Sequence, residues 1–105
     1  MEQGAEPIAC SLSSGEAQDR AREWAALLDR AQGVRHPVAG GIRIELRPLD
    51  GVAAELHRLV AAEGACCPFL TMRLETAEEA VVLTVTAPAE AESLITDLFG
   101  VAPRT

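Results

Sequence analysis

Aromatic side chains are scarce in this chain of 105 residues, which has one tryptophan, two phenylalanines and no tyrosine. Apolar residues nevertheless make up 49% of it, so alanine, leucine and valine must fill most of a core. A chain of this length forms one domain and buries roughly 60–70% of the surface that its unfolded form exposes. We therefore expect a single domain over residues 1–105. Its core is expected to be thin, and burial of a dimer interface would add to its stability.

Basic residues are also few, with 9 against 16 acidic residues and a formal net charge of -7. Nucleic acids and anionic lipid surfaces attract proteins through clustered positive charge. The composition therefore argues against direct binding of nucleic acid and against docking on a membrane surface.

Long apolar runs are missing as well, and none approaches the roughly 20 residues of a membrane span. Residues 1–7 are acidic and polar and lack the hydrophobic region of a secretory signal. We expect a cytoplasmic protein. Thiols stay reduced there, so clustered cysteines more often bind metals or do chemistry than form structural disulfides.

Apolar periodicity predicts a small sheet and three helices. Strict alternation favours strands at 8–12, 42–47, 72–76 and 81–86, and helical spacing favours helices from Ser13 to about 31, at 52–66 and at 89–99. Residues 34–41 contain His-Pro and Gly-Gly pairs and predict a loop or a poor edge strand. The order β-α-β-α-β-β-α predicts an α+β two-layer sandwich, with a mainly antiparallel sheet of three to four strands and helices on one face.

The most informative feature is the adjacent pair Cys66 and Cys67, followed at once by Pro68. Proline disfavours helical backbone in the residue before it, so the helix at 52–66 is expected to end at the thiols. One reading is a pair of small buried apolar residues. The other is thiolate ligation or redox chemistry, including a strained vicinal disulfide. No paired C-x-x-C motif is present, which argues against a structural zinc site.

Cys10 is the third thiol and shares a predicted strand face with Ile8 and Leu12. Taken alone it would be a core residue. If that strand ends near the end of the helix at 52–66, however, Cys10 would approach the cysteine pair. Three thiolates without a fourth ligand suit Hg(II), Pb(II) or As(III), whereas Zn(II) prefers four ligands.

Glu63 continues the apolar helical stripe of Leu56 and Leu59 and lies one turn before Cys67. It is either a solvated acid near a helix end or a carboxylate beside the thiols, where it would accept protons on metal binding or act as a ligand. His36 and His57 lack any motif that would make them ligands.

A cysteine enzyme remains the alternative from another class. In it Cys67 would be the nucleophile and Glu63 the acid or base of an organometal lyase or reductase. A thiol at a helix C-terminus is disfavoured as thiolate by the helix dipole. If Pro68 opened a new turn, however, Cys67 would cap its start and its thiolate would be favoured. A third alternative is an interaction domain with structural cysteines.

The chain also resembles a known family. The segments Ala9-Cys-Ser-Leu12, Trp24-Ala-Ala-Leu-Leu28 and Glu63-Gly-Ala-Cys-Cys-Pro-Phe69, with the strand at 82–88 and the closing Leu98-Phe-Gly100, look like a small actinobacterial domain. That domain occurs alone or appended to MerR-family (mercury-resistance-type) regulators. The resemblance implies the sensing or sequestering half of such a system, without DNA binding of its own and with a regulator as partner. A homodimer is the other expected partner, because the thin core would gain from a buried interface.

Together these observations predict a cytoplasmic protein of heavy-metal resistance that binds mercury or arsenic, as Hg(II) or As(III). The expected ligand set is Cys10, Cys66, Cys67 and Glu63. The ion is the bound ligand of the protein, and no further cofactor is expected.

Overall fold

The computed structural model describes the backbone of residues 14–66 and 69–101, and side chains within 18–65 and 69–101. The elements are α1 (Ser14–Arg30), β1 (Val34–Val38), β2 (Gly41–Leu46), α2 (Val52–Cys66), β3 (Thr71–Thr76), β4 (Val81–Thr86), the 3-10 turn η1 (Ala89–Ala91) and α3 (Glu92–Phe99). The predicted strand at 8–12, with Cys10, lies outside the described residues.

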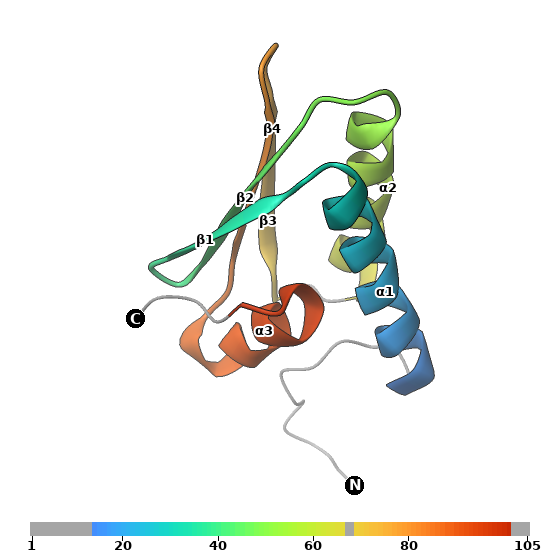
Figure 1. Cartoon of the computed structure of the whole chain (residues 1–105). Helices are drawn as coiled ribbons and strands as arrows, with labels where there is room; N and C mark the ends of the chain where they lie inside the picture. The colour runs from blue at the N-terminus through green and yellow to red at the C-terminus, as the bar shows by residue number, and fades with distance from the viewer. Residues whose placement is uncertain (1–13, 67–68, 102–105) are drawn as a thin grey trace, which may run out of the picture.

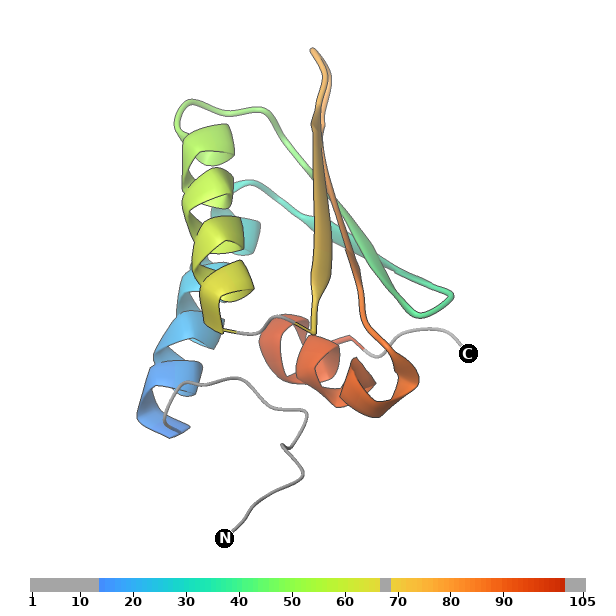
Figure 2. The ribbon, with the colours of Figure 1, turned by 180° about the vertical axis from the view of Figure 1, so that it is seen from behind.

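The predicted α+β two-layer class is confirmed (Figure 1). One layer is an antiparallel sheet with strand order β1-β2-β4-β3. The helices α1 and α2 lie side by side against one face of it, and α3 packs at one end against α1, β2 and β4. Figure 2, from behind, shows β3 at the edge remote from β1. Within the described residues, no helix is long and apolar enough to cross a membrane.

Residues 34–41, predicted as a loop or a poor edge strand, form β1 and its turn. Val34 to Val38 pairs with β2 in the register Val34↔Glu45 to Val38↔Gly41. Pro37 has no backbone N–H to donate, which is tolerated because β1 is an edge strand. Gly40 has φ +72° in this turn, a conformation that L side chains rarely adopt.

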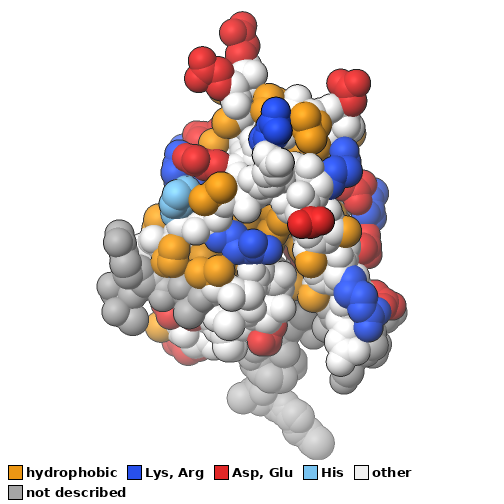
Figure 3. Space-filling model, viewed as in Figure 1, with side chains coloured by type: hydrophobic (Ala, Val, Ile, Leu, Met, Phe, Trp, Pro, Cys, Tyr) orange, Lys and Arg blue, Asp and Glu red, His pale blue; other side chains and the backbone are white. Residues whose placement is uncertain are grey.

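The sheet has a buried face and an open face, and period-2 alternation assigns residues to each. On β2 and β4 the helix-facing residues are buried, namely Ile42, Ile44, Leu46, Val81, Leu83 and Val85. The residues between them are only half-buried. Figure 3 shows acidic, basic and apolar side chains interspersed over the surface in the view of Figure 1, with acids where the β3–β4 hairpin turns.

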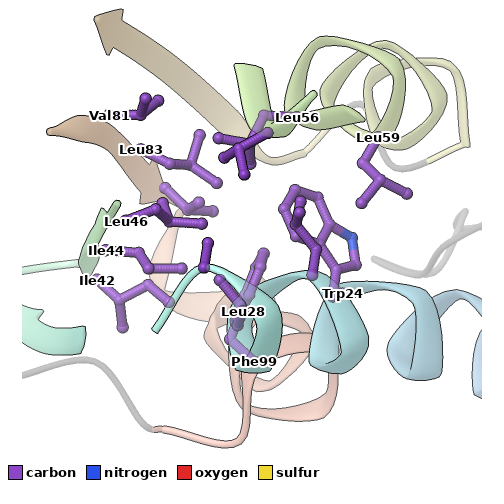
Figure 4. Packing of buried hydrophobic residues seen from close by; sticks show 14 of the residues in the cluster. Trp24, Leu28, Ile42, Ile44, Leu46, Leu56, Leu59, Val81, Leu83 and Phe99 are labelled. Atoms are coloured by element: carbon purple, nitrogen blue, oxygen red, sulfur yellow. The ribbon is translucent and has the colours of Figure 1, made fainter. Parts of the chain in front are cut away.

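The core lies between the helices and the sheet and is centred on Trp24, which is fully buried. Figure 4 shows its indole directed from α1 toward Leu56 and Leu59 of α2. The ring of Phe99 in α3 meets it edge-on at a centroid distance of 4.9 Å, the geometry that aromatic quadrupoles favour. Two of the three aromatic residues thus join all three helices in one apolar cluster.

Candidate functional site

Glu63 is the buried charged residue of the described core, with 0% of its surface exposed. It lies on α2 in line with Val52, Leu56 and Leu59, all of which are also fully buried. Helical geometry explains this position, since residues three, four and seven apart share one face. The reading of Glu63 as a solvated helix-end acid is therefore wrong, and the inward orientation predicted from the stripe is confirmed.

Two side chains of α1 hold one oxygen of the Glu63 carboxylate. Trp24 Nε1 donates a hydrogen bond of 2.9 Å to Glu63 Oε2. The Arg20 guanidinium lies beside the same oxygen, with Nη1 at 3.1 Å from Oε2. Arg20 and Trp24 are four residues apart and so project from the same side of α1. A buried carboxylate needs such partners, because a lone charge is very costly to remove from water.

Among the described residues, the other oxygen of Glu63 has no partner. Oε1 is buried, and no hydrogen-bond donor among the described residues reaches it. Arg20 Nη1 is likewise buried without a well-aligned hydrogen bond, although it forms the ion pair with Oε2. Leaving a buried polar atom unpaired costs about 1–3 kcal/mol. Chemically, Oε1 is a free acceptor for a proton or a cation inside the protein.

Glu63 lies one helical turn before the cysteine pair. Helix α2 ends at Cys66, as predicted from Pro68. The side chain of Cys66 lies outside the described part of the chain, as do Cys10 and Cys67. Within residues 18–65 and 69–101, no three His, Cys, Asp or Glu side chains form a metal-ligand group. The convergence of the three thiols and Glu63 therefore stays a prediction.

The exposed rims of α1 and α2 are joined by a second set of charges. Arg58 Nη2 of α2 contacts Glu23 Oε1 of α1 and Glu55 Oε2 of its own helix, each at 2.6 Å. The hydrogen bond from Arg58 lowers the pKa of Glu55 below its usual value, and both acids raise the pKa of Arg58. Arg20 Nε also lies 3.8 Å from Glu23 Oε2. The buried and exposed charge groups therefore meet at Glu23, and together they fix α1 against α2.

The sequence identified Glu63 as a candidate site residue but not its two partners, Trp24 and Arg20. A usable signal was present. Arg20 precedes Trp24 by four residues, and a glutamate on an apolar stripe requires a cation or a hydrogen-bond donor from a neighbouring element. His36 and His57 are exposed, on β1 and α2, and lie outside this cluster. His36 Nε2 instead lies 3.7 Å from Glu45 Oε1 on the open sheet face.

Comparisons with protein-family models, with curated proteins and with solved structures give no match for this chain.

Proposed function

We propose that this protein binds a soft metal or metalloid ion, Hg(II) or As(III) first, through the thiolates of Cys10, Cys66 and Cys67. The observation that carries the proposal is the buried, half-satisfied carboxylate of Glu63 one turn before the cysteine pair. Cysteines must lose their protons to bind such ions, so binding releases protons. A fixed carboxylate with a free oxygen accepts a proton or completes the ligand set.

Stability alone gives a weak reason for this arrangement. Replacing a buried ion pair by well-packed apolar residues is often neutral or stabilising. Glu63 lies on the same buried face of α2 as Leu56 and Leu59, so its neighbours on that face are apolar. Oε1 has no partner among the described residues, which adds a penalty that a purely structural ion pair would avoid. A chemical use of this oxygen would explain why a carboxylate stands at this buried position.

The biological setting follows from the resemblance to the small MerR-associated domain. We propose that the chain is a sensing or sequestering unit of heavy-metal resistance, alone or beside a regulator that supplies DNA binding. Its net charge of -7 supports this division, because contact with DNA would require clustered positive charge.

The same free oxygen also favours a second candidate, a thiol-dependent enzyme. In that case Cys67 would attack an organometal or another thiol-reactive substrate, and Glu63 would transfer the proton. Turnover separates this candidate from simple binding.

The first prediction concerns the thiols. Titration of the fully reduced chain by calorimetry, with Hg(II) and separately with arsenite, should show one tightly bound ion per chain. Cys66→Ser or Cys67→Ser should abolish tight arsenite binding, and the Cys66→Ser/Cys67→Ser double variant should abolish tight binding of both ions. Cys10→Ser should weaken arsenite binding more than Hg(II) binding, because As(III) takes three sulfurs and Hg(II) is satisfied by two. Ala65→Ser, an exposed change beside the pair, is the matched control and should bind like wild type.

Glu63→Gln provides the second arm of this experiment, because it keeps the shape of the side chain and removes its negative charge. If Glu63 accepts protons or binds the ion, the variant should bind more weakly, with a changed pH dependence of affinity. If the chain is an enzyme, affinity should persist while turnover is lost. Tight binding by a Cys66→Ser/Cys67→Ser double variant would overturn the thiolate site. Unchanged binding and turnover in Glu63→Gln would remove Glu63 from it.

A further inference from the structure

Among the described strands, β3 is an edge strand that contains neither proline nor lysine. The strand order places β1 and β3 at the two edges. β1 contains Pro37, whereas Thr71–Thr76 contains no proline or glycine, and the chain has no lysine. Edge strands expose unpaired N–H and C=O groups, which proteins commonly protect with proline or lysine. Figure 2 shows β3 in front of the sheet, and no described strand pairs with its outer side.

The helix above this edge also leaves room for a neighbour. Helix α2 packs on β3 and turns Glu55 and Arg58 toward Glu23 of α1. At 3.6 residues per turn, the flank of α2 that faces away from α1 carries residues without formal charge at pH 7. These residues are Ala53, His57, Val60 and Gly64. A Cβ added to Gly64 would meet no atom of the described residues within 4 Å. A second helix can therefore approach α2 on the β3 side without meeting an acidic or basic row.

The side chains of β3 are complementary to a second copy of the same strand. Arg73 and Glu75 project from the open face, with 77% and 62% of their side chains exposed. Their mutual contact is long, with Arg73 Nε 3.8 Å from Glu75 Oε2, whereas the Arg43–Glu45 pair on β2 is at 2.6 Å. Met72 and Leu74 on the helix-facing side are only half-buried. Both sets of side chains are therefore free to gain further partners.

Only one symmetric register satisfies both charges. Directly opposed residues of two antiparallel strands lie on the same face of the sheet. In a symmetric pair of identical strands, the two-fold axis must therefore pass between two copies of the same residue, which lie opposite each other. An axis at Arg73 or Glu75 places like charges opposite each other, which is destabilising. An axis at Met72 leaves both charges unpaired. An axis at Leu74 sets Arg73 opposite Glu75 of the second copy, twice by symmetry, and sets Leu74 opposite itself.

We propose that two copies of this chain form a symmetric dimer by antiparallel pairing of their β3 strands about Leu74. The two four-stranded sheets then join into one. The half-buried Met72 and Leu74 side chains of both copies meet beneath the paired α2 helices. The proposal is argued from the edge and charges of β3 and from the flank of α2 away from α1, and none of these observations concerns ion binding.

Sedimentation equilibrium of the full chain in reducing buffer tests the proposal. Wild type should show a monomer–dimer equilibrium across the micromolar range. Arg73→Glu and Glu75→Arg each place like charges opposite each other twice, so each should raise the dissociation constant by about tenfold or more. The combined swap restores opposite charges in the same register and should return to within about threefold of wild type. Arg43→Glu, on the central strand β2, is the matched control and should dimerise like wild type.

Gly64→Arg tests the helix flank separately. Arginine favours helix more than glycine and has open space in the single copy, so this variant folds but should dimerise weakly. The proposal is overturned if wild type is monomeric at every concentration, or if single reversals dimerise like wild type. It is equally overturned if the combined swap fails to restore pairing, because the register about Leu74 would then be wrong.

Discussion

At the scale of single residues, Trp24 combines two roles. Its ring is fully buried against Phe99 and the α2 leucines, and its Nε1–H is the donor for Glu63 Oε2. A buried tryptophan usually finds a partner for this N–H, and a buried carboxylate needs donors. The two requirements satisfy each other across 39 positions of sequence. Arg20 then supplies the countercharge at 3.1 Å.

Trp24→Phe separates these roles, because it keeps an aromatic ring and removes the donor. We expect it to lower the free energy of unfolding through both a smaller ring and an unpaired Glu63. In a Glu63→Leu background no carboxylate is left unpaired, so Trp24→Phe should lower the free energy of unfolding by about 1.5–3 kcal/mol less than it does in wild type. Urea unfolding of wild type, both single variants and the double variant gives this coupling. Additive losses would show that the Trp24–Glu63 hydrogen bond does not stabilise the fold.

Among the elements, alternation and spacing could predict β2, β3, β4 and the helices, because each follows a local period. The end of α2 at Cys66 follows from Pro68, again a local effect. For β1 the sequence left two alternatives, a loop or a poor edge strand, because Pro37 and the glycines favour a loop and only pairing with β2 makes the segment an edge strand. The Arg20–Glu63 contact was missed because periodicity gives the buried face of a helix but not the partner that faces it.

Two glycines show how an element depends on its surroundings. A Cβ at Gly41 would overlap the Val85 carbonyl oxygen and lie 2.8 Å from Thr86 Cα, both backbone atoms of β4. Gly64 lies in α2 with open space around it. We expect Gly41→Ala to destabilise the protein by at least about 1–3 kcal/mol. Gly64→Ala should stabilise it by about 0.5–1 kcal/mol through helix propensity.

Denaturant midpoints of the two variants, measured at a concentration where the chain is monomeric, give both values. Each variant is the control for the other, because both replace glycine by alanine and their expected changes in stability have opposite signs. Equal effects would mean that β4 moves away from β2 at little cost, against the tight Gly41↔Thr86 pairing.

At the scale of the whole molecule, the α+β order and the covering of one sheet face by helices could be predicted from the sequence, because each strand and helix has an apolar residue pattern on one face only. The three thiols are different. Their convergence stays a prediction, because Cys10, Cys67 and the side chain of Cys66 lie outside the described residues. The core needs only two aromatic residues at its centre, since leucine, isoleucine and valine fill the remaining layer.

The net charge of -7 predicts how the whole molecule responds to salt. Exposed ion pairs such as Arg22–Asp19, with side chains 72% and 70% exposed, contribute little. The repulsion among unpaired acids acts over longer distances and is screened once the Debye length falls to about 10 Å near 0.1 M salt. We therefore expect the thermal unfolding midpoint to rise when sodium chloride is added at neutral pH, as followed by circular dichroism of the monomer.

Neutralising the exposed turn residues in Glu78→Gln/Glu79→Gln should raise the midpoint at low salt and reduce its salt response. A midpoint that falls with added salt would show instead that the ion pairs outweigh the repulsion.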